Sequence, residues 1–210
     1  MVFESDKSYW DQTWKDRTGD TVKMNAGKFM HLIDVLWSKP HFAIKNKLDV
    51  GCGTGIHAHF LSLFNPLWKT RWTGIDLAES AIAKAKTFGL EAHVSDLLDY
   101  KTEKRFNLFL FLDVLEHIED HEAIGKKIKD LASDNYTIYG NCPLYLSDND
   151  HERIINVNTI ARFLAAAGCN GGLKPVVYGI NGFPYITFEA TSTGKFESWM
   201  DIIPSLVKAK

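Results

Sequence analysis

The sequence predicts a doubly wound α/β fold, in which a mostly parallel sheet of seven strands is covered by helices on both faces. Strand-like and helix-like patterns alternate along the chain, as in β-α-β units. The run Phe106–Leu112 is apolar on both faces apart from Asn107, which is typical of a central strand buried between helices. The short segment 179–184, with Gly182 and Pro184, separates the last two expected strands. It suits a tight connection, so we expect the sheet to end in a C-terminal antiparallel hairpin.

The expected elements follow from the periodicity of apolar residues. Strands are expected at Lys47–Val50, Arg71–Asp76, Leu90–Val94, Phe106–Leu112, Tyr136–Gly140, Lys174–Tyr178 and Tyr185–Ala190. Helices are expected at Val22–Ser38, Ile56–Phe64, Glu79–Phe88, His121–Leu131, Asn158–Ala167 and Phe196–Lys208. Ligands of such sheets bind outside the carboxyl ends of the strands, so the residues that follow the strands are the candidates for a site.

Length, composition and charge limit the kinds of protein that this chain can be. The chain has 210 residues, of which 45% are hydrophobic and 24% charged, and its net charge is −2. These values suit one main domain, residues 41–210, preceded by an N-terminal helical cap or lid, residues 1–40. Without a net positive charge we expect no nucleic-acid partner, and no apolar run approaches the ~20 residues of a membrane span. The 3 cysteines are widely spaced and the N-terminus lacks the apolar core of a signal peptide, so we expect a cytoplasmic protein with free thiols.

A glycine-rich turn follows the first strand of the main domain. Residues 48–55 read Leu-Asp-Val-Gly-Cys-Gly-Thr-Gly, and a helical pattern begins at Ile56. Glycine permits a sharp turn and a close approach of a ligand, and the first N–H groups of the next helix point at that ligand. The dinucleotide fingerprint needs a glycine where Ile56 stands, and the phosphate-binding loop needs glycine and lysine where Ile56 and His57 stand. The turn therefore predicts a cradle for a small cofactor of another kind.

The pattern Asp-x-Gly-x-Gly-x-Gly, from Asp49 to Gly55, resembles the first motif of the class I S-adenosylmethionine-dependent methyltransferases. The resemblance implies the Rossmann-like methyltransferase fold, with S-adenosylmethionine as cofactor and S-adenosylhomocysteine as product. It is strengthened by Asp76, which ends the next strand, and by Asp96, which follows the third. In the family these acids accept from the ribose hydroxyls and from the adenine amine, and the Leu97 amide lies near a ring nitrogen. From the residues alone, Asp76 could instead cap the following helix, and Asp96 could be a solvated loop acid.

A fourth motif, Asp113-Val-Leu-Glu-His117, follows the central strand. It resembles the D-V-L-E-H motif of small-molecule methyltransferases, including those of the ubiquinone type, and places Asp113 and His117 at the floor of an active site. The ubiquinone-type motif begins with glutamate and is linked to a divalent metal, but the first acid here is aspartate, so we expect no metal. The resemblance assigns cofactor binding to Asp49, Gly51, Cys52, Gly53, Gly55, Asp76, Leu77, Asp96, Leu97 and Asp113.

Methyl transfer is an in-line displacement, so the protein mainly aligns the reactants and excludes water. A hydroxyl or amine acceptor also needs a base, and His117 is the first candidate because the ordinary pKa of imidazole lies near neutrality. His151, in the segment after the fifth strand, is the second. Both histidines could instead be structural or solvated. The aromatic segment Tyr9–Trp14 is expected to cover the cofactor as part of the lid, or simply to dock on the sheet.

The sequence therefore predicts a methyltransferase that acts on a small or medium-sized acceptor. One alternative is an NAD(P)-dependent oxidoreductase, which Ile56 and Asp96 disfavour. Another is a non-catalytic module that only binds S-adenosylmethionine, and it would carry the same glycines. The sequence identifies neither the acceptor, nor the methylated atom, nor the oligomeric state.

Overall fold

A computed structural model describes residues 7–17, 45–64, 72–143, 155–178 and 184–192. Its helices are α1 (Lys7–Arg17), α3 (Ile56–Phe64), α4 (Glu79–Thr87), the 3-10 turn η3 (Leu115–His117), α5 (His121–Leu131) and α6 (Val157–Ala166). Its strands are β1 (Lys47–Val50), β2 (Trp72–Asp76), β3 (Glu91–Val94), β4 (Phe106–Leu112), β5 (Ala132–Pro143), β6 (Asn170–Tyr178) and β7 (Pro184–Thr191). The helices expected at Val22–Ser38 and Phe196–Lys208 lie outside the described residues.

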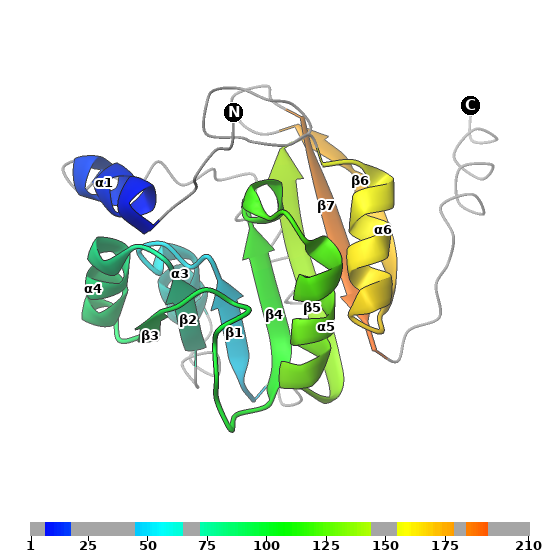
Figure 1. Cartoon of the computed structure of the whole chain (residues 1–210), viewed down its shortest axis with the longest axis horizontal. Helices are drawn as coiled ribbons and strands as arrows, with labels where there is room; N and C mark the ends of the chain where they lie inside the picture. Colours follow the sequence, from blue (N-terminus) through cyan, green and yellow to red (C-terminus); the bar gives the residue numbers. More distant parts are fainter. Residues whose placement is uncertain (1–6, 18–44, 65–71, 144–154, 179–183, 193–210) are drawn as a thin grey trace.

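The strands form one 7-stranded sheet in the order β3-β2-β1-β4-β5-β7-β6. β1 pairs in parallel with β2 and β4, and β7 runs antiparallel to both of its neighbours, β5 and β6. The expected mostly parallel α/β sheet with antiparallel C-terminal strands is confirmed. The strand order reverses between β1 and β4, whose carboxyl ends point toward the side on which α1 lies (Figure 1). This is the position at which doubly wound sheets bind their ligands.

The core lies on both faces of the central strand. Phe109 and Phe111 of β4 belong to the apolar cluster that includes residues of α5 and α6. Leu108 and Leu110 of the same strand belong to a second cluster, which includes residues of α3 and α4. Alternate side chains of a strand point to opposite faces, so a continuous apolar run serves two helical layers, as expected for β4.

Two strands are clearly longer than the sequence predicts, namely β5 and also β6, which begins at Asn170 and not at Lys174. Periodicity placed the fifth strand at 136–140, whereas β5 continues directly from α5 and spans Ala132–Pro143. Asn107, the polar residue of β4, donates from Nδ2 to the Ser133 hydroxyl at 2.6 Å and to the Asn135 carbonyl at 3.1 Å. These side-chain hydrogen bonds hold the polar start of β5 against β4. A pattern of hydrophobic residues cannot predict a strand segment that is held in this way.

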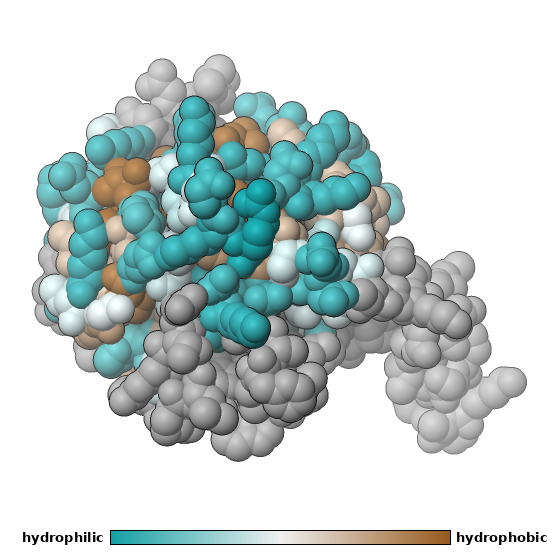
Figure 2. Space-filling model, turned by 90° about the horizontal axis from the view of Figure 1, so that it is seen from below, coloured by the Kyte–Doolittle hydropathy of each residue, from teal (hydrophilic) through white to brown (hydrophobic). Residues whose placement is uncertain are grey.

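The far end of the molecule, at the amino ends of the parallel strands, is the face seen in Figure 2. Hydrophilic residues cover most of its described surface, and the apolar areas are small and separate. None of the described helices is long and apolar enough to cross a membrane.

Candidate active site

The glycine turn between β1 and α3 is built from residues with left-handed backbone. Gly51 has φ 62° and Gly53 has φ 51°, a region that side chains with a Cβ adopt only with strain. A Cβ on Gly51 would lie 2.6 Å from Val114, and one on Gly53 would lie 2.5 Å from the indole of Trp14. The turn therefore requires glycine both for its conformation and for the close approach of neighbouring groups.

Asp76, at the end of β2, ties the turn to the next helix. Its Oδ2 accepts a hydrogen bond from the Gly53 N–H at 2.8 Å, and its Oδ1 accepts one from the Ala78 N–H at 2.9 Å. Burial raises the pKa of this carboxyl above its ordinary value of 3.8, although the two N–H groups act against that rise. The carboxylate thus holds the glycine turn and the residue before α4 together, whereas the N-cap position of α4 is Ala78, so Asp76 is not the N-cap that the capping alternative expected.

A cavity of about 700 Å³ opens where β1, β2, β3 and β4 end. Most of the residues expected to bind the cofactor line it, namely Gly51, Cys52, Gly53, Asp76, Leu77, Asp96, Leu97 and Asp113, and so does the candidate base His117. Asp49 and Gly55 do not line it, and His151 lies outside the described residues. The topology thus brings together residues that are as far apart as 51 and 117 in the sequence.

Asp113 has an unusual backbone, with φ 56°, a conformation that aspartate tolerates better than most residues. Its N–H donates to Asn141 of β5, at 3.1 Å from both the main-chain oxygen and Oδ1. This bond ends β4 with a sharp turn into η3, on which His117 lies. The His117 ring meets the indole of Trp10 edge-on, with centroids 4.8 Å apart and an interplanar angle of 80°. Strained backbone and an aromatic wall therefore place His117 beside the cavity.

Asp49 lies inside the sheet, level with Gly74 of β2 and Leu110 of β4. Its side chain is completely buried, and burial together with the nearby Asp76 carboxylate raises its pKa from 3.8 to about 7. A buried carboxyl that holds its proton near neutral pH is unsuited to pairing with a cofactor cation. Asp49 lies within the strand that carries the turn, and it is not among the residues that line the cavity.

The raised pKa of Asp49 makes stability depend on pH. Between about pH 4 and pH 7 the folded protein keeps a proton that the unfolded chain releases, so the free energy of unfolding falls as pH rises through this window. Asp49→Asn, which imitates the neutral acid, is expected to be more stable than wild type at pH 8 by roughly 2–4 kcal/mol and similar to it at pH 4. Urea unfolding at both pH values measures this. Equal pH dependence of the two proteins would contradict it, and Asp130→Asn, at an exposed site, serves as the control.

Cys52 is the residue between the first two glycines of the turn. Its side chain is buried, and burial, with help from the Asp49 and Asp76 carboxylates, raises the pKa of the thiol well above its ordinary value. A protonated thiol is a poor nucleophile. A Cβ on Gly74 would lie 2.7 Å from the Cys52 sulfur, so the thiol serves to pack the turn against β2.

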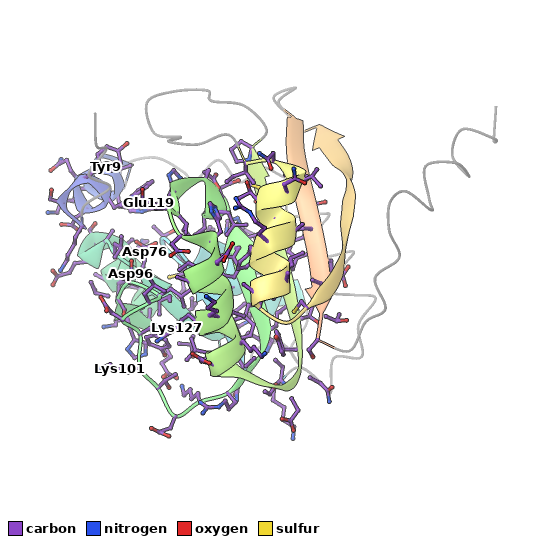
Figure 3. All side chains as sticks on the ribbon, turned by 45° about the vertical axis from the view of Figure 1, so that its right-hand side comes forward. Tyr9, Asp76, Asp96, Lys101, Glu119 and Lys127 are labelled. Carbon is purple, nitrogen blue, oxygen red and sulfur yellow. The ribbon has the colours of Figure 1, made fainter. Side chains whose placement is uncertain are left out.

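The described lining of the cavity is acidic. The acids that line it are Asp76, Asp96, Asp113, Glu119 and Asp120, and no lysine or arginine is among its described lining residues. Figure 3 shows Asp76, Asp96 and Glu119 toward the end of the sheet where α1 lies, with Lys101 and Lys127 farther down. Among the residues that the structure describes, no group of three His, Cys, Asp or Glu side chains is arranged to hold a metal ion.

The sequence predicted that the aromatic segment Tyr9–Trp14 would cover the cofactor or dock on the sheet, and Trp10 and Trp14 of α1 line the cavity. Other lining residues were not expected. Ile118, Glu119 and Asp120 precede α5, whose first turn is capped by Asp120 Oδ1 accepting from the Ala123 N–H at 2.9 Å. These three residues belong to no recognised motif, so no signal in the sequence indicated them. They reach the cavity because of the turn that follows β4.

Comparison with known proteins agrees with this geometry. The sequence profile of the family described as "Methyltransferase domain" matches residues 23–171. (S)-coclaurine N-methyltransferase of Papaver somniferum is 27% identical over 99 residues, which are 44% of this chain and 28% of that protein. Ubiquinone biosynthesis O-methyltransferase of Bordetella bronchiseptica is 32% identical over 98 residues, 42% of this chain and 38% of that protein. The chain thus spans less than half the length of these curated relatives.

Solved structures share the fold. Magnesium protoporphyrin IX methyltransferase of Synechocystis, crystallised with S-adenosylhomocysteine, superposes with a TM-score of 0.69 at 15% identity and covers 89% of this chain and 97% of that one. The N-methyltransferase NodS of Bradyrhizobium japonicum, with the same ligand, gives a TM-score of 0.64 at 16% identity, with coverages of 88% and 99%. At these identities the likeness concerns the fold.

Proposed function

Because the chain belongs to the methyltransferase-domain family, we propose that it transfers a methyl group from S-adenosylmethionine to a small or medium-sized acceptor. The observation that carries the proposal is the cavity at the ends of β1 to β4, where the glycine turn and Asp76 meet. The crystallised structures with the same fold support the choice of cofactor, since they hold S-adenosylhomocysteine or S-adenosylmethionine.

The residues present fit this cofactor. Gly51 and Gly53 give the turn the left-handed backbone that residues with a Cβ adopt only with strain, and Asp76 offers a fixed carboxylate whose lone pairs suit ribose hydroxyls. Asp96, whose Oδ1 accepts from the Leu98 N–H at 2.7 Å, has a second oxygen for the adenine amine, and the Leu97 amide lies beside it. Leu77, Cys52 and Asp113 would complete the walls. Asp49 supports the turn from within β1.

When bound, S-adenosylmethionine supplies a methyl group on a positively charged sulfur, and transfer leaves S-adenosylhomocysteine as the acceptor's lone pair forms the new bond. The task of the chain is to align the acceptor, exclude water and take the proton that the acceptor loses. We assign the proton to His117, whose ring is held against Trp10 at the cavity wall. His151 remains a second candidate base. The N-terminal segment, residues 1–40, is proposed as the lid of the main domain, residues 41–210.

The charge of the cavity bears on the acceptor. Of the five lining carboxylates, those of Asp76, Asp96 and Asp113 are assigned to the cofactor, which leaves Glu119 and Asp120 for the acceptor. With no lysine or arginine among the described lining residues, these two acids disfavour anions and attract cations, and Trp10 adds an aromatic ring of the kind that contacts ammonium groups. The relatives reported above are named for nitrogen as well as oxygen methylation. We therefore propose that an uncharged or basic acceptor is preferred, and an amine before a carboxylate.

The direct test is ligand binding followed by transfer. S-adenosylhomocysteine is expected to raise the melting temperature, since a ligand at 100 times its Kd stabilises the native state by about 2.7 kcal/mol. No shift at millimolar ligand would overturn the assignment, and a shift with NADH instead would favour the oxidoreductase. Labelled methyl groups should then pass to amines in preference to carboxylates of similar size. Binding without transfer to any acceptor would favour the alternative that the protein is a non-catalytic module that only binds S-adenosylmethionine.

A further inference from the structure

Helix α1 is attached to the rest of the protein through a closed ring of contacts. Asp11 of α1 accepts a hydrogen bond at Oδ1 from the Ser80 N–H at 2.8 Å, and its main-chain oxygen accepts from the Ser80 hydroxyl at 3.2 Å. Ser80 belongs to the first turn of α4, and the residue just before that helix, Ala78, donates to Asp76. Asp76 in turn accepts from Gly53, and Trp14 of α1 lies against Gly53. The ring therefore leads from α1 through α4 and the glycine turn back to α1.

We propose that Asp11 is a positioning residue for the cofactor: by capping the amino end of α4, it fixes α1 so that Trp14 closes the glycine turn. The inference rests on the proposed function, because it takes the cavity beside this turn as the cofactor site. It concerns a contact between two helices that no motif of the sequence contains.

The cap of α4 is missing from its usual place. The residue at the N-cap position is Ala78, which has no side chain that can accept a hydrogen bond from the first turn. Asp11 supplies that acceptor from another helix, and its negative charge lies at the positive end of the α4 dipole. Lys15 adds an ion pair to Asp11 at 2.8 Å, but the Lys15 side chain is 58% exposed, so this pair contributes little to holding α1.

The position of Asp11 on α1 explains how it acts on Trp14. The two residues are three positions apart, so they lie on neighbouring parts of one helix face. A helix of 11 residues is marginally stable by itself, and α1 is polar apart from its aromatic residues, so its placement depends on the contacts it makes. With the Asp11–Ser80 contact in place, the Trp14 indole is held over Gly53 and lines the cavity.

The test measures the affinity and dissociation rate of S-adenosylhomocysteine in the full chain. Asp11→Ala is expected to weaken Kd roughly 5- to 30-fold, the range of a lost helix cap, and to raise the dissociation rate by a similar factor. Asp11→Asn should bind within about threefold of wild type, because an asparagine side chain also caps helices. Lys15→Ala, which keeps the cap, is the matched control and should differ little from wild type. Ser80→Ala keeps the N–H but loses the hydroxyl bond to Asp11, so it should weaken binding less than Asp11→Ala does.

A double-mutant cycle separates this role from a general structural one. If Asp11 acts through Trp14, the Asp11→Ala/Trp14→Ala double variant should bind no more weakly than Trp14→Ala alone. Affinity of Asp11→Ala within twofold of wild type, additive effects in the cycle, or a loss of binding that accompanies global unfolding without ligand would each overturn the proposal. A wild-type protein that binds neither S-adenosylhomocysteine nor S-adenosylmethionine would overturn the proposed function itself, and this inference with it.

Discussion

Replacing Asp76 by alanine is expected to weaken the binding of S-adenosylhomocysteine by roughly a hundredfold or more. The change removes the acceptor for two backbone N–H groups, those of Gly53 and Ala78, and also the proposed acceptor for the ribose hydroxyls. Each hydrogen bond to a charged group contributes about 1.5–3 kcal/mol, so the loss of two ribose contacts alone accounts for this factor. Titration calorimetry with the purified protein measures the effect.

Matched variants separate the two roles of Asp76, which are to hold the backbone N–H groups and to bind the ribose hydroxyls. Asp76→Asn has one acceptor oxygen where two are used, so its amide NH₂ would face a backbone N–H, and binding should still fall at least about tenfold. His117→Ala should change the affinity for S-adenosylhomocysteine by no more than about threefold, because its proposed role is toward the acceptor. Asp99→Ala, at an exposed position, should have no effect. The role assignment would be wrong if His117→Ala abolished binding while Asp76→Ala left it intact.

The sequence predicts the fold of this chain well because its local patterns and its topology agree. The apolar run of β4, the glycines after β1 and the acids after β2 and β3 each follow a strand, and parallel strands must bring their carboxyl ends to one edge. Asp76, Asp96 and His117 therefore reach one cavity without any long-range information beyond the fold class.

Contacts between distant helices are what the sequence could not predict. Nothing near Asp11 indicates that it meets Ser80, since the partner is 69 residues away and the bond involves a backbone N–H. The same holds for Trp14 over Gly53. Asp49 shows the opposite case: its motif suggested a ligand contact, and the structure places it inside a strand that is paired on both sides, buried and away from the cavity lining. The polar start of β5 was missed because side-chain hydrogen bonds, not apolar periodicity, hold it.

The centre of the sheet, beside the proposed site, tolerates no added volume. Gly140 of β5 lies level with Phe111 of β4 and Phe188 of β7. A Cβ at this position would come within 2.2 Å of the Phe188 ring and 2.7 Å of the Phe111 carbonyl oxygen. Gly140→Ala is therefore expected to destabilise the protein by about 3 kcal/mol and to lower its melting temperature by roughly 6–12 °C.

The effect should extend to the cofactor site, because the next residue, Asn141, accepts the N–H of Asp113 and thereby holds the turn that ends β4. We therefore expect weaker S-adenosylhomocysteine binding in Gly140→Ala even well below its melting temperature.

The control for the stability prediction is Gly89→Ala, where φ is +83° but no atom lies within 4 Å of the new Cβ, so only the backbone strain of about 1–2 kcal/mol remains. Phe188→Leu in the Gly140→Ala background should recover part of the loss, since it removes the ring that the new methyl group meets. Thermal unfolding of these variants measures the steric and the backbone-strain contributions to the free energy of unfolding. If Gly140→Ala were as stable as Gly89→Ala, β5 and β7 would be able to move apart without loss of stability, and the prediction would be wrong.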